Sequence, residues 1–346
     1  MTRPSQRSRS FRRLCAVLVA LSLVAPASIA GARAEVVLRA ISALPISVDY
    51  TRSFLRFIDK VNTAGKGTVQ IRFLGGPEVI PQTEQPDAVR RGVVDLQYGP
   101  ASFITGIVPE GDALVGSRYT APVTRANGGL ALLDRIYQRK LGVHLLGHFD
   151  SGVGFHIYLR KPPRRTADGG IDFHGIKLRS QPIYREFFRQ LGASVVSVPP
   201  AETFTALGRG VVDGAGWPLI GITDLSWDRQ LKYRIDPSFF QTDLIALVNL
   251  HRWQTLPKAA RQILTQVAIR HERESYAYFQ RQLPKIDAKV RAEGMQVITL
   301  KGEAARKYLD LANAVPWARL AKRDPTHYQA LREKFYGNEQ AETEQP

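Results

Sequence analysis

A short pattern occurs twice in the chain, and it constrains the fold more than any other feature of the sequence. Arg91-Gly92-Val93-Val94-Asp95 is echoed by Arg209-Gly210-Val211-Val212-Asp213. Each copy follows a stretch whose apolar residues have helical spacing, and each precedes a stretch typical of a strand. Two copies in equivalent places predict two units of like topology, each built from alternating strands and helices.

The residues around each copy predict the same order of elements: strand, helix, strand, helix and strand. In the first unit these lie at 36–41, 47–61, 68–74, 82–91 and 92–98. In the second unit they lie at 176–180, 184–191, 194–198, 201–209 and 215–218. Such alternation is the signature of a sheet with helices on its faces, so we expect an α/β protein.

The rest of the chain predicts how the two domains are joined. We expect a first α/β domain at 35–155 together with part of 250–300, and a second at 156–249. A long helix at 257–292 is expected to span both domains, and 301–346 is expected to form a C-terminal helical segment and a tail.

The N-terminus has the pattern of a cleaved export signal. Residues 1–34 carry six arginines and no acid, then an apolar run from Leu14 to Val24, and they end in Ala32-Arg33-Ala34 before Glu35. Arginines, a short apolar run and an A-x-A site indicate a signal peptide, so we expect a periplasmic protein. The single cysteine, Cys15, lies in this segment, which leaves the predicted mature chain without a disulfide or a cysteine metal site.

The chain is basic, with a formal net charge of +17. Removing the six arginines of the signal peptide leaves +11, which is spread over the sequence. A basic surface attracts anionic partners. No basic motif with interleaved aromatic residues accompanies it, so we expect no nucleic-acid partner.

Motifs for catalysis and cofactor binding are missing. The seven histidines show no H-E-x-x-H spacing, and the candidates for a nucleophile elbow, a Walker A loop and a dinucleotide fingerprint each lack a required residue. We therefore expect a protein that binds rather than catalyses, with no cofactor and no metal. An alternative is a secreted enzyme that acts on a small anionic substrate through an unrecognised acid pair.

A strand that ends in a cation is the first candidate for a site. Gly175 to Ser180 contains a short apolar strand that delivers Arg179 to its carboxyl end. Open α/β sheets place their ligands at that end, and a guanidinium pairs well with a carboxylate. The alternative is an arginine that merely lies at the surface.

Several segments together resemble the substrate-binding proteins of TRAP transporters, the dicarboxylate-receptor (DctP-like) family. The resemblance rests on short matches that occur in the family's order over most of residues 36–300: 64–69, 175–179, 191–193, 202–207, 210–214 and 249–257. It implies a two-domain clamp, similar to other periplasmic binding proteins, with a long domain-spanning helix.

The resemblance also implies site residues. Arg179 takes the place of the arginine that pairs with the ligand carboxylate, Gln241 lies on a linking strand, and Tyr98 lies at the end of a strand in the first domain. Trp217 stands where many members have asparagine, and His156 stands where a second arginine is common. Trp217, Tyr98 and Tyr184 are expected to wall an apolar or aromatic pocket.

These departures define the expected ligand. Gly216 stands where some members that bind oxo-acids carry a glutamate that holds a cation, which argues against a bound metal. A histidine in place of an arginine argues against a dianion. We expect a receptor, monomer or homodimer, that binds a small monocarboxylate and delivers it to membrane TRAP permease subunits. A sensor that binds a ligand without transport remains an alternative.

Overall fold

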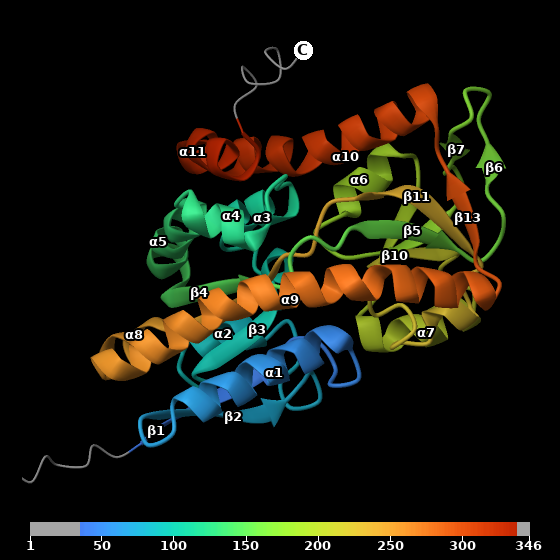
Figure 1. The fold of residues 1–346 in the computed structure, drawn as a ribbon. Coiled ribbons are helices and arrows are strands. Elements are labelled where there is room, and N and C mark those ends of the chain that lie inside the picture. Colours follow the sequence, from blue (N-terminus) through green and yellow to red (C-terminus); the bar gives the residue numbers. More distant parts are fainter. Residues whose placement is uncertain (1–34, 338–346) are drawn as a thin grey trace, which may run out of the picture. The chain divides into compact units, whose positions relative to one another are not determined.

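The structure of the protein is a computed structural model that describes residues 35–337. The predicted signal peptide at 1–34 and the tail at 338–346 lie outside the described residues. Two mixed sheets, with helices packed around them, make up the described part (Figure 1).

The first sheet has five strands in the order β2-β1-β3-β12-β4. Its β1 runs parallel to β2 and β3, whereas β12 is antiparallel to both β3 and β4. The helices α1 and α2 connect the first three strands, which confirms the predicted order of strand, helix, strand, helix and strand. The bounds are β1 Val36–Ser42, α1 Asp49–Ala64, β2 Val69–Gly75, α2 Gln85–Arg90, β3 Leu96–Pro100, β4 Val143–Phe149 and β12 Leu244–Asn249.

The second sheet has six strands in the order β13-β11-β5-β10-β8-β9. Its β8, β9 and β10 are parallel neighbours connected by α6 and α7, so the second predicted unit is confirmed as well. The strand β5 is antiparallel to both β10 and β11. The bounds are β5 Phe155–Leu159, β8 Lys177–Ser180, α6 Arg185–Gln190, β9 Ser194–Ser197, α7 Pro200–Gly208, β10 Gly214–Pro218, β11 Tyr233–Phe239 and β13 Gln296–Thr299.

The repeated pattern performs the same task in both units. Gly92 and Gly210 end a helix in the left-handed region, with φ of 74° and 71°. The Asp95 carboxylate then accepts a hydrogen bond from the backbone N–H of Arg39 on β1 (2.8 Å). The Asp213 carboxylate accepts one from the N–H of Lys177 on β8 (2.9 Å). Each aspartate thus ties the incoming strand to the neighbouring parallel strand, a constraint that explains why the two sequences are alike.

The sheet partners of two strands late in the chain come from the structure rather than from the sequence. The strand β12, which the sequence analysis grouped with 156–249, pairs with β3 and β4 of the first sheet. The strand β13 pairs with β11 of the second sheet. An apolar run predicts a buried strand but does not choose its hydrogen-bonding partners. The domain limits themselves stay a prediction.

Several short elements were not expected from the sequence. Besides β11, they are the α-helices α3 (Asp112–Val115), α4 (Ala121–Ala126) and α8 (Leu250–Thr255), the 3-10 helices η1 (Ala101–Phe103), η2 (Pro109–Gly111) and η3 (Trp227–Arg229), and the small β6–β7 pair (Arg164–Arg165 and Ile171–Asp172). Residues after α4 form the helix α5 (Gly129–Leu141), and the predicted C-terminal helical segment forms α10 (Gly302–Arg323) and α11 (Pro325–Phe335).

The long helix α9 (Lys258–Ala292) runs past both sheets (Figure 1). Its Glu272 pairs with Arg125 of α4, which packs beside the first sheet. Its Asp287 pairs with Arg234 of β11 in the second sheet (2.7 Å). The predicted spanning helix is therefore confirmed. None of the helices within residues 35–337 combines the length and the apolar character needed to cross a membrane.

Two segments connect the sheets side by side, 150–154 after β4 and 240–243 before β12. The N–H of Thr242 donates to the carbonyl of Val153 (3.0 Å), and the N–H of Gly152 donates to the Gln241 side chain (3.0 Å). These bonds fix the two connections to each other, and they place the start of β12 next to the second sheet.

Candidate ligand-binding site

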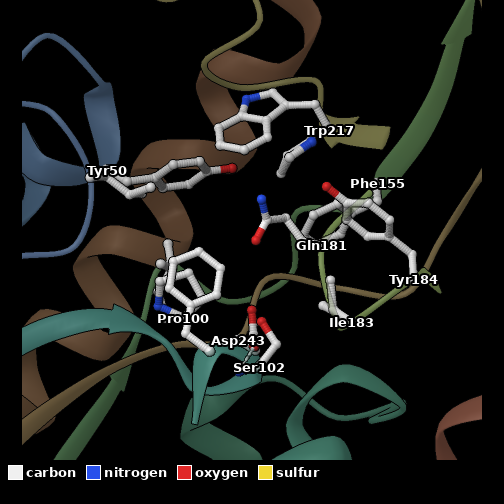
Figure 2. A pocket seen from close by; sticks show the side chains of 13 residues that line it. Tyr50, Pro100, Ser102, Phe155, Gln181, Ile183, Tyr184, Trp217 and Asp243 are labelled. Carbon is white, nitrogen blue, oxygen red and sulfur yellow. Dashed lines mark hydrogen bonds between the residues drawn. The ribbon is translucent and has the colours of Figure 1, made fainter. Parts of the chain in front are cut away.

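A pocket lies between the two sheets, and both contribute to its walls (Figure 2). About 430 Å³ of space that no atom fills lies between the lining residues, part of it continuous with solvent. The first sheet and its loops contribute Leu44, Tyr50, Pro100, Ser102, Phe103, Asp243 and Leu244. The second contributes Phe155, Gln181, Ile183, Tyr184, Trp217 and Pro218.

The topology of the sheets determines the position of this pocket. Gln181 and Tyr184 follow β8, Trp217 lies near the end of β10, and Leu44 and Ser102 follow β1 and β3. All four are parallel strands that end toward the same space. Ligands of α/β sheets bind outside the carboxyl ends of such strands, and here two sheets present those ends to one pocket.

Arg179 is completely buried behind the Tyr184 and Trp217 walls of the pocket. Its Nε donates to the carbonyl of Val198 (2.9 Å), and its Nη1 donates to the Tyr184 hydroxyl (2.6 Å). A longer contact joins Nη1 to the carbonyl of Gly216 (3.4 Å). All of these acceptors are neutral, and no carboxylate of residues 35–337 forms an ion pair with this guanidinium.

Aromatic rings surround the Arg179 charge. The guanidinium carbon lies 5.4 Å from the ring centroid of Trp217 and 5.2 Å from that of Trp227. Cations over indole faces gain a modest electrostatic stabilisation. Burial nevertheless lowers the pKa of Arg179 below its ordinary value. Burial also raises the pKa of Tyr184 to about 12, so its hydroxyl stays protonated and donates to the carbonyl of Gly216 (2.9 Å).

Three buried donors at this pocket have no hydrogen-bond partner within the described chain. They are Nη2 of Arg179, the hydroxyl of Tyr50 and Nε1 of Trp217. A buried donor without a partner costs free energy, and such groups are rare in folded proteins. Figure 2 shows the Tyr50 hydroxyl directed into the pocket. The Trp217 nitrogen is turned away from it, toward Gly221. An unpartnered donor that faces the pocket favours a ligand that offers an acceptor.

Two of the six predicted site residues, Tyr184 and Trp217, line the pocket, and Arg179 lies buried directly behind them. The other three do not line it. Arg179 contacts both Tyr184 and Trp217 from behind the pocket wall. Tyr98, His156 and Gln241 are not among the lining residues. That these three residues contact the ligand stays a prediction. In the structure each of them has a partner within the protein.

Each of the three residues outside the lining has another partner. Tyr98 stacks on Phe54 with ring centroids 4.7 Å apart, and its hydroxyl donates to the buried carboxylate of Asp150. His156 Nδ1 lies 2.9 Å from Asp236. The Gln241 amide donates to the carbonyls of Ser117 (3.0 Å) and Tyr119 (2.9 Å), so it braces the connection between the sheets.

Sequence reasoning missed four polar residues of the lining: Tyr50, Ser102, Gln181 and Asp243. Gln181 comes two residues after Arg179, at the same strand end, so the rule that found Arg179 also applies to it. Asp243 is the only charge at the start of a nearly apolar stretch, which was a usable signal. Tyr50 lies in the first turn of α1, and nothing in its local sequence distinguishes it from a core aromatic residue.

Asp243 is the one acid in the lining, and it is 2% exposed. Its Oδ2 accepts a hydrogen bond from the backbone N–H of Ser102 (2.7 Å). Burial raises the pKa of Asp243 from its ordinary value of 3.8 to about 6, although the hydrogen bonds from Ser102 act in the opposite direction. No lysine, arginine or histidine of residues 35–337 forms an ion pair with it.

Position 216 leaves no room for an acidic side chain at this pocket. A Cβ added to Gly216 would lie 2.7 Å from the Phe188 ring and 3.1 Å from the Tyr184 ring. A glutamate there would have to displace both aromatic residues. The absence of an acid at position 216 thus follows from the packing around β10.

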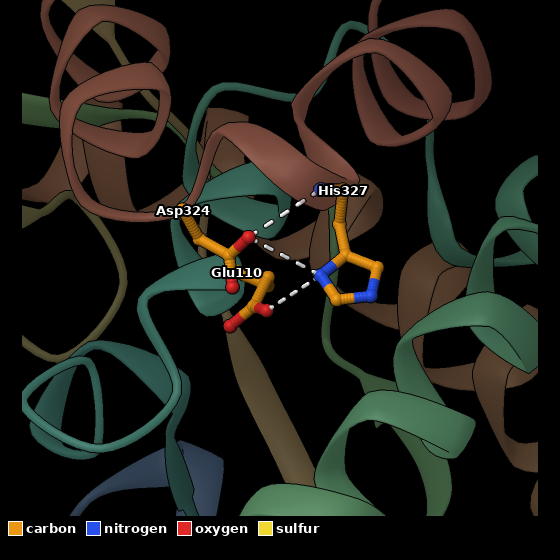
Figure 3. Close-up of side chains that lie close together, drawn as sticks. All are labelled: Glu110, Asp324 and His327. Atoms are coloured by element: carbon orange, nitrogen blue, oxygen red, sulfur yellow. Dashed lines mark hydrogen bonds and ion pairs between the residues drawn. The ribbon is translucent and has the colours of Figure 1, made fainter.

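Within residues 35–337, one group of side chains has the donor atoms of a metal site, and it lies away from the pocket (Figure 3). The ligand atoms of Glu110, Asp324 and His327 lie within 4.8 Å of one another. The Lys140 ammonium already contacts both carboxylates, at 2.7 Å from Glu110. The group is therefore an ion-paired cluster that joins α5, η2 and the start of α11.

Comparison with known proteins places the chain in a family. The sequence pattern of the family described as "Bacterial extracellular solute-binding protein, family 7" (DctP) matches residues 45–322. A monocarboxylate 2-oxoacid-binding periplasmic protein of Nostoc sp. is 25% identical over 211 residues, which cover 57% of this chain and 55% of that protein.

Solved structures agree with the fold. A TRAP transporter solute-binding protein of Bordetella bronchiseptica, with calcium and picolinate bound, superposes with a TM-score of 0.76 at 21% identity and covers 90% of this chain and 94% of that one. An extracytoplasmic solute receptor of Bordetella pertussis that binds pyroglutamic acid gives 0.75 at 19% identity and covers 86% and 99%. The chain belongs to bacterial extracellular solute-binding protein family 7, and its resemblance to the substrate-binding proteins of TRAP transporters is confirmed.

Proposed function

We propose that this protein is a periplasmic receptor that binds a small monocarboxylate with an apolar or aromatic body and delivers it to a membrane TRAP permease. The observation that carries the proposal is the buried Arg179 guanidinium, which has no acidic partner within residues 35–337 and one donor nitrogen without any partner. Buried charges in proteins are normally paired. A ligand carboxylate supplies the missing charge.

The lining of the pocket supports a ligand with a single negative charge. None of the lining residues is Lys, Arg or His, so Arg179 behind the wall is the one cation at this site. His156, expected in place of a second arginine, lies against Asp236 and brings no free positive charge. A dianion would place its second carboxylate among apolar side chains, where an unpaired charge is costly.

The body of the ligand is expected to be apolar or flat. Leu44, Phe155, Ile183 and Leu244 line the pocket together with the Trp217 indole. Burying apolar area against such walls contributes roughly 25 cal/mol per Å². Three of the similar proteins point the same way, because picolinate, pyroglutamate and monocarboxylate 2-oxoacids are small acids with one carboxylate.

Binding between the two sheets also provides a signal for delivery. The lining comes from both sheets, so a bound acid joins them and favours the arrangement in which they are close. Hinge closure around a ligand is a common response in periplasmic receptors. We propose that the permease recognises this ligand-bound arrangement.

A thermal-shift screen tests the proposal. The purified protein is heated with aliphatic, cyclic and aromatic acids that carry one or two carboxylates, and affinities of the hits are measured by calorimetry. We expect monocarboxylates to raise the unfolding temperature most. In Arg179→Met the affinity should fall at least about 100-fold, because truncating one partner of a buried charge pair costs roughly 2–5 kcal/mol.

Two further variants make the result specific. Arg179→Lys keeps a positive charge but loses the planar fork, and it should recover only part of the affinity. Arg306→Met removes an exposed arginine of α10 that lies in surface ion pairs, and it should bind like the native protein. If Arg179→Met keeps the full thermal shift, the assignment of the carboxylate site is wrong.

A further inference from the structure

The pocket contains a second buried charge, and its sign is opposite to that of Arg179. Asp243 lines the pocket from the start of β12, next to Ser102, whereas Trp217 and Tyr50 lie across the space from it (Figure 2). The Gln181 side chain lies between these groups in the same view. A receptor for acids therefore presents a carboxylate to its own ligand.

This arrangement restricts which part of a ligand can approach Asp243. Two carboxylates close together in an apolar pocket repel strongly, because the low local dielectric strengthens their interaction. The carboxylate of the ligand is therefore directed away from Asp243, toward the unpartnered donors of Arg179 and Tyr50. The opposite part of the ligand lies against Asp243.

Asp243 can act only as a hydrogen-bond acceptor toward a ligand. An ionised carboxylate only accepts, and Ser102 donates to it from its backbone N–H (2.7 Å) and from its hydroxyl. No cation of residues 35–337 pairs with it, so its charge is not neutralised from within the described chain. A buried acceptor of this strength is satisfied best by an N–H or O–H group of the ligand.

A metal ion is a poorer explanation for Asp243. The group of possible metal ligands found within residues 35–337 consists of Glu110, Asp324 and His327, and Asp243 is not part of it. Gly216, the neighbouring position that could bring a second acid, is packed against Phe188 and Tyr184. One carboxylate alone is a weak site for a hard cation, which needs several oxygen ligands.

We propose that Asp243 accepts a hydrogen bond from an N–H or O–H group of the ligand, so that the receptor selects acids that carry such a donor apart from their carboxylate. Lactam acids, pyrrole-type acids and hydroxy acids have this chemistry. The inference rests on the proposed function, because it assumes that the carboxylate binds at Arg179. The Tyr50 hydroxyl, held protonated by burial, adds a donor on the carboxylate side.

The test uses pairs of acids that differ in one donor. Pyroglutamate is compared with the lactone 5-oxotetrahydrofuran-2-carboxylate, pyrrole-2-carboxylate with furan-2-carboxylate, and lactate with 2-fluoropropionate. Affinities are measured by calorimetry on the full protein, with and without a calcium chelator. In at least one pair, the member with the donor should bind at least about tenfold more tightly, because an unpaired buried acceptor is costly.

Variants at Asp243 test whether this residue causes the preference for ligands with an N–H or O–H donor. Asp243→Asn has nearly the same size and can still accept from Ser102, but its amide offers donors as well. In this variant the preference should fall to within about threefold, because the charge that favours a donor is gone. Asp243→Ser serves as a second variant without the carboxylate. Asp150→Asn changes a fully buried acid outside the pocket lining, and it should leave the ratio unchanged.

Each outcome decides between the two proposals. Equal binding within every pair overturns the inference but leaves the proposed function standing. A preference that survives in Asp243→Asn and Asp243→Ser overturns it too, as does binding that requires calcium. If none of the six acids binds, the proposed function fails, and the inference fails with it.

Discussion

A partly buried arginine and a fully buried one have opposite surroundings in this protein, and the difference separates a structural charge from one that is available to a ligand. Arg125 of α4 contacts both carboxylate oxygens of Glu272 on α9, at 2.6 and 2.8 Å. Arg179 at the end of β8 contacts three neutral oxygens and no carboxylate within the described residues. The first pair joins two helices, whereas the second charge is balanced by nothing that the described chain provides.

The comparison shows that burial alone does not indicate function. Both guanidiniums are held by several hydrogen bonds, and both lie next to α/β elements. The missing countercharge is what distinguishes Arg179, because an unpaired charge in an apolar surrounding costs free energy that a ligand can recover. Stability measurements on the two residues therefore test the comparison directly.

The largest effect is expected at Arg125. Arg125→Met leaves the Glu272 carboxylate buried without its partner, and that side chain is 1% exposed. Removing one partner of a buried pair typically costs 3–5 kcal/mol. Since a quarter of the Arg125 side chain is exposed, we expect the free energy of unfolding to fall by about 3 kcal/mol, measured by urea denaturation.

The double variant Arg125→Met with Glu272→Gln removes the stranded charge. It should recover most of the lost stability, because a neutral amide tolerates burial better than an unpaired carboxylate. A loss below about 0.5 kcal/mol in the single variant would show that water screens the pair as it does at a surface. Arg125 would then not be a structural charge, and the comparison with Arg179 would no longer hold.

The second effect is expected at Asp243, the acid of the pocket. Here the substitution should raise the free energy of unfolding, whereas Arg125→Met should lower it. Burial raises the pKa of Asp243 from 3.8 to about 6, so the folded protein binds more protons than the unfolded chain between these values. Stability from this group is therefore lost as the pH rises through that window. Asp243→Asn does not titrate, and at pH 7 without ligand it should be more stable than the native protein by about 2 kcal/mol.

Urea unfolding at several pH values checks this sign. The difference between Asp243→Asn and the native protein should vanish near pH 4 and reach its full size by pH 7. Asp150, whose pKa burial also raises to about 6, is present in both proteins and cancels from the difference. A variant that is less stable than the native protein at pH 7 would show that the carboxylate has a stabilising partner.

The parts of this picture that sequence predicted are those with a local cause. The repeated pattern predicted both units because each Asp95 and Asp213 ties neighbouring parallel strands together. The strand-end rule placed Arg179 next to a site for the same reason, since parallel strands end at one edge of a sheet. Tyr184 follows β8, and Trp217 lies near the end of β10 in the same sheet.

The parts that sequence did not predict depend on contacts between distant segments. Gln241 and Asp243 precede β12 by a few residues, outside the regular strand, so alternation could not tell which of them faces the pocket. The neighbouring segment 150–154 decides which of them faces the pocket, because the N–H of Gly152 in that segment donates to the Gln241 side chain. Tyr98, which was expected at the pocket, is not among its lining residues, and its hydroxyl donates to the buried carboxylate of Asp150.

The smallest effect is expected at Arg179 itself, in the absence of ligand. Arg179→Met removes a buried charge that has no acidic partner within residues 35–337. The carbonyls that it contacts keep other donors, because Gln181 also donates to Val198 (3.0 Å) and Tyr184 to Gly216 (2.9 Å). We expect the free energy of unfolding to change by less than about 1 kcal/mol, since lost hydrogen bonds and relieved burial of charge offset each other.

Urea denaturation of the ligand-free protein measures this change, with Arg125→Met as the reference for a structural arginine. The measurement is informative because the same substitution should abolish most of the ligand affinity. A residue that matters greatly for binding and little for folding has its partner outside the chain. A loss as large as that of Arg125→Met would instead mean that Arg179 stabilises the packing of Trp217 and Trp227 around it, and that the unpaired charge is part of the core.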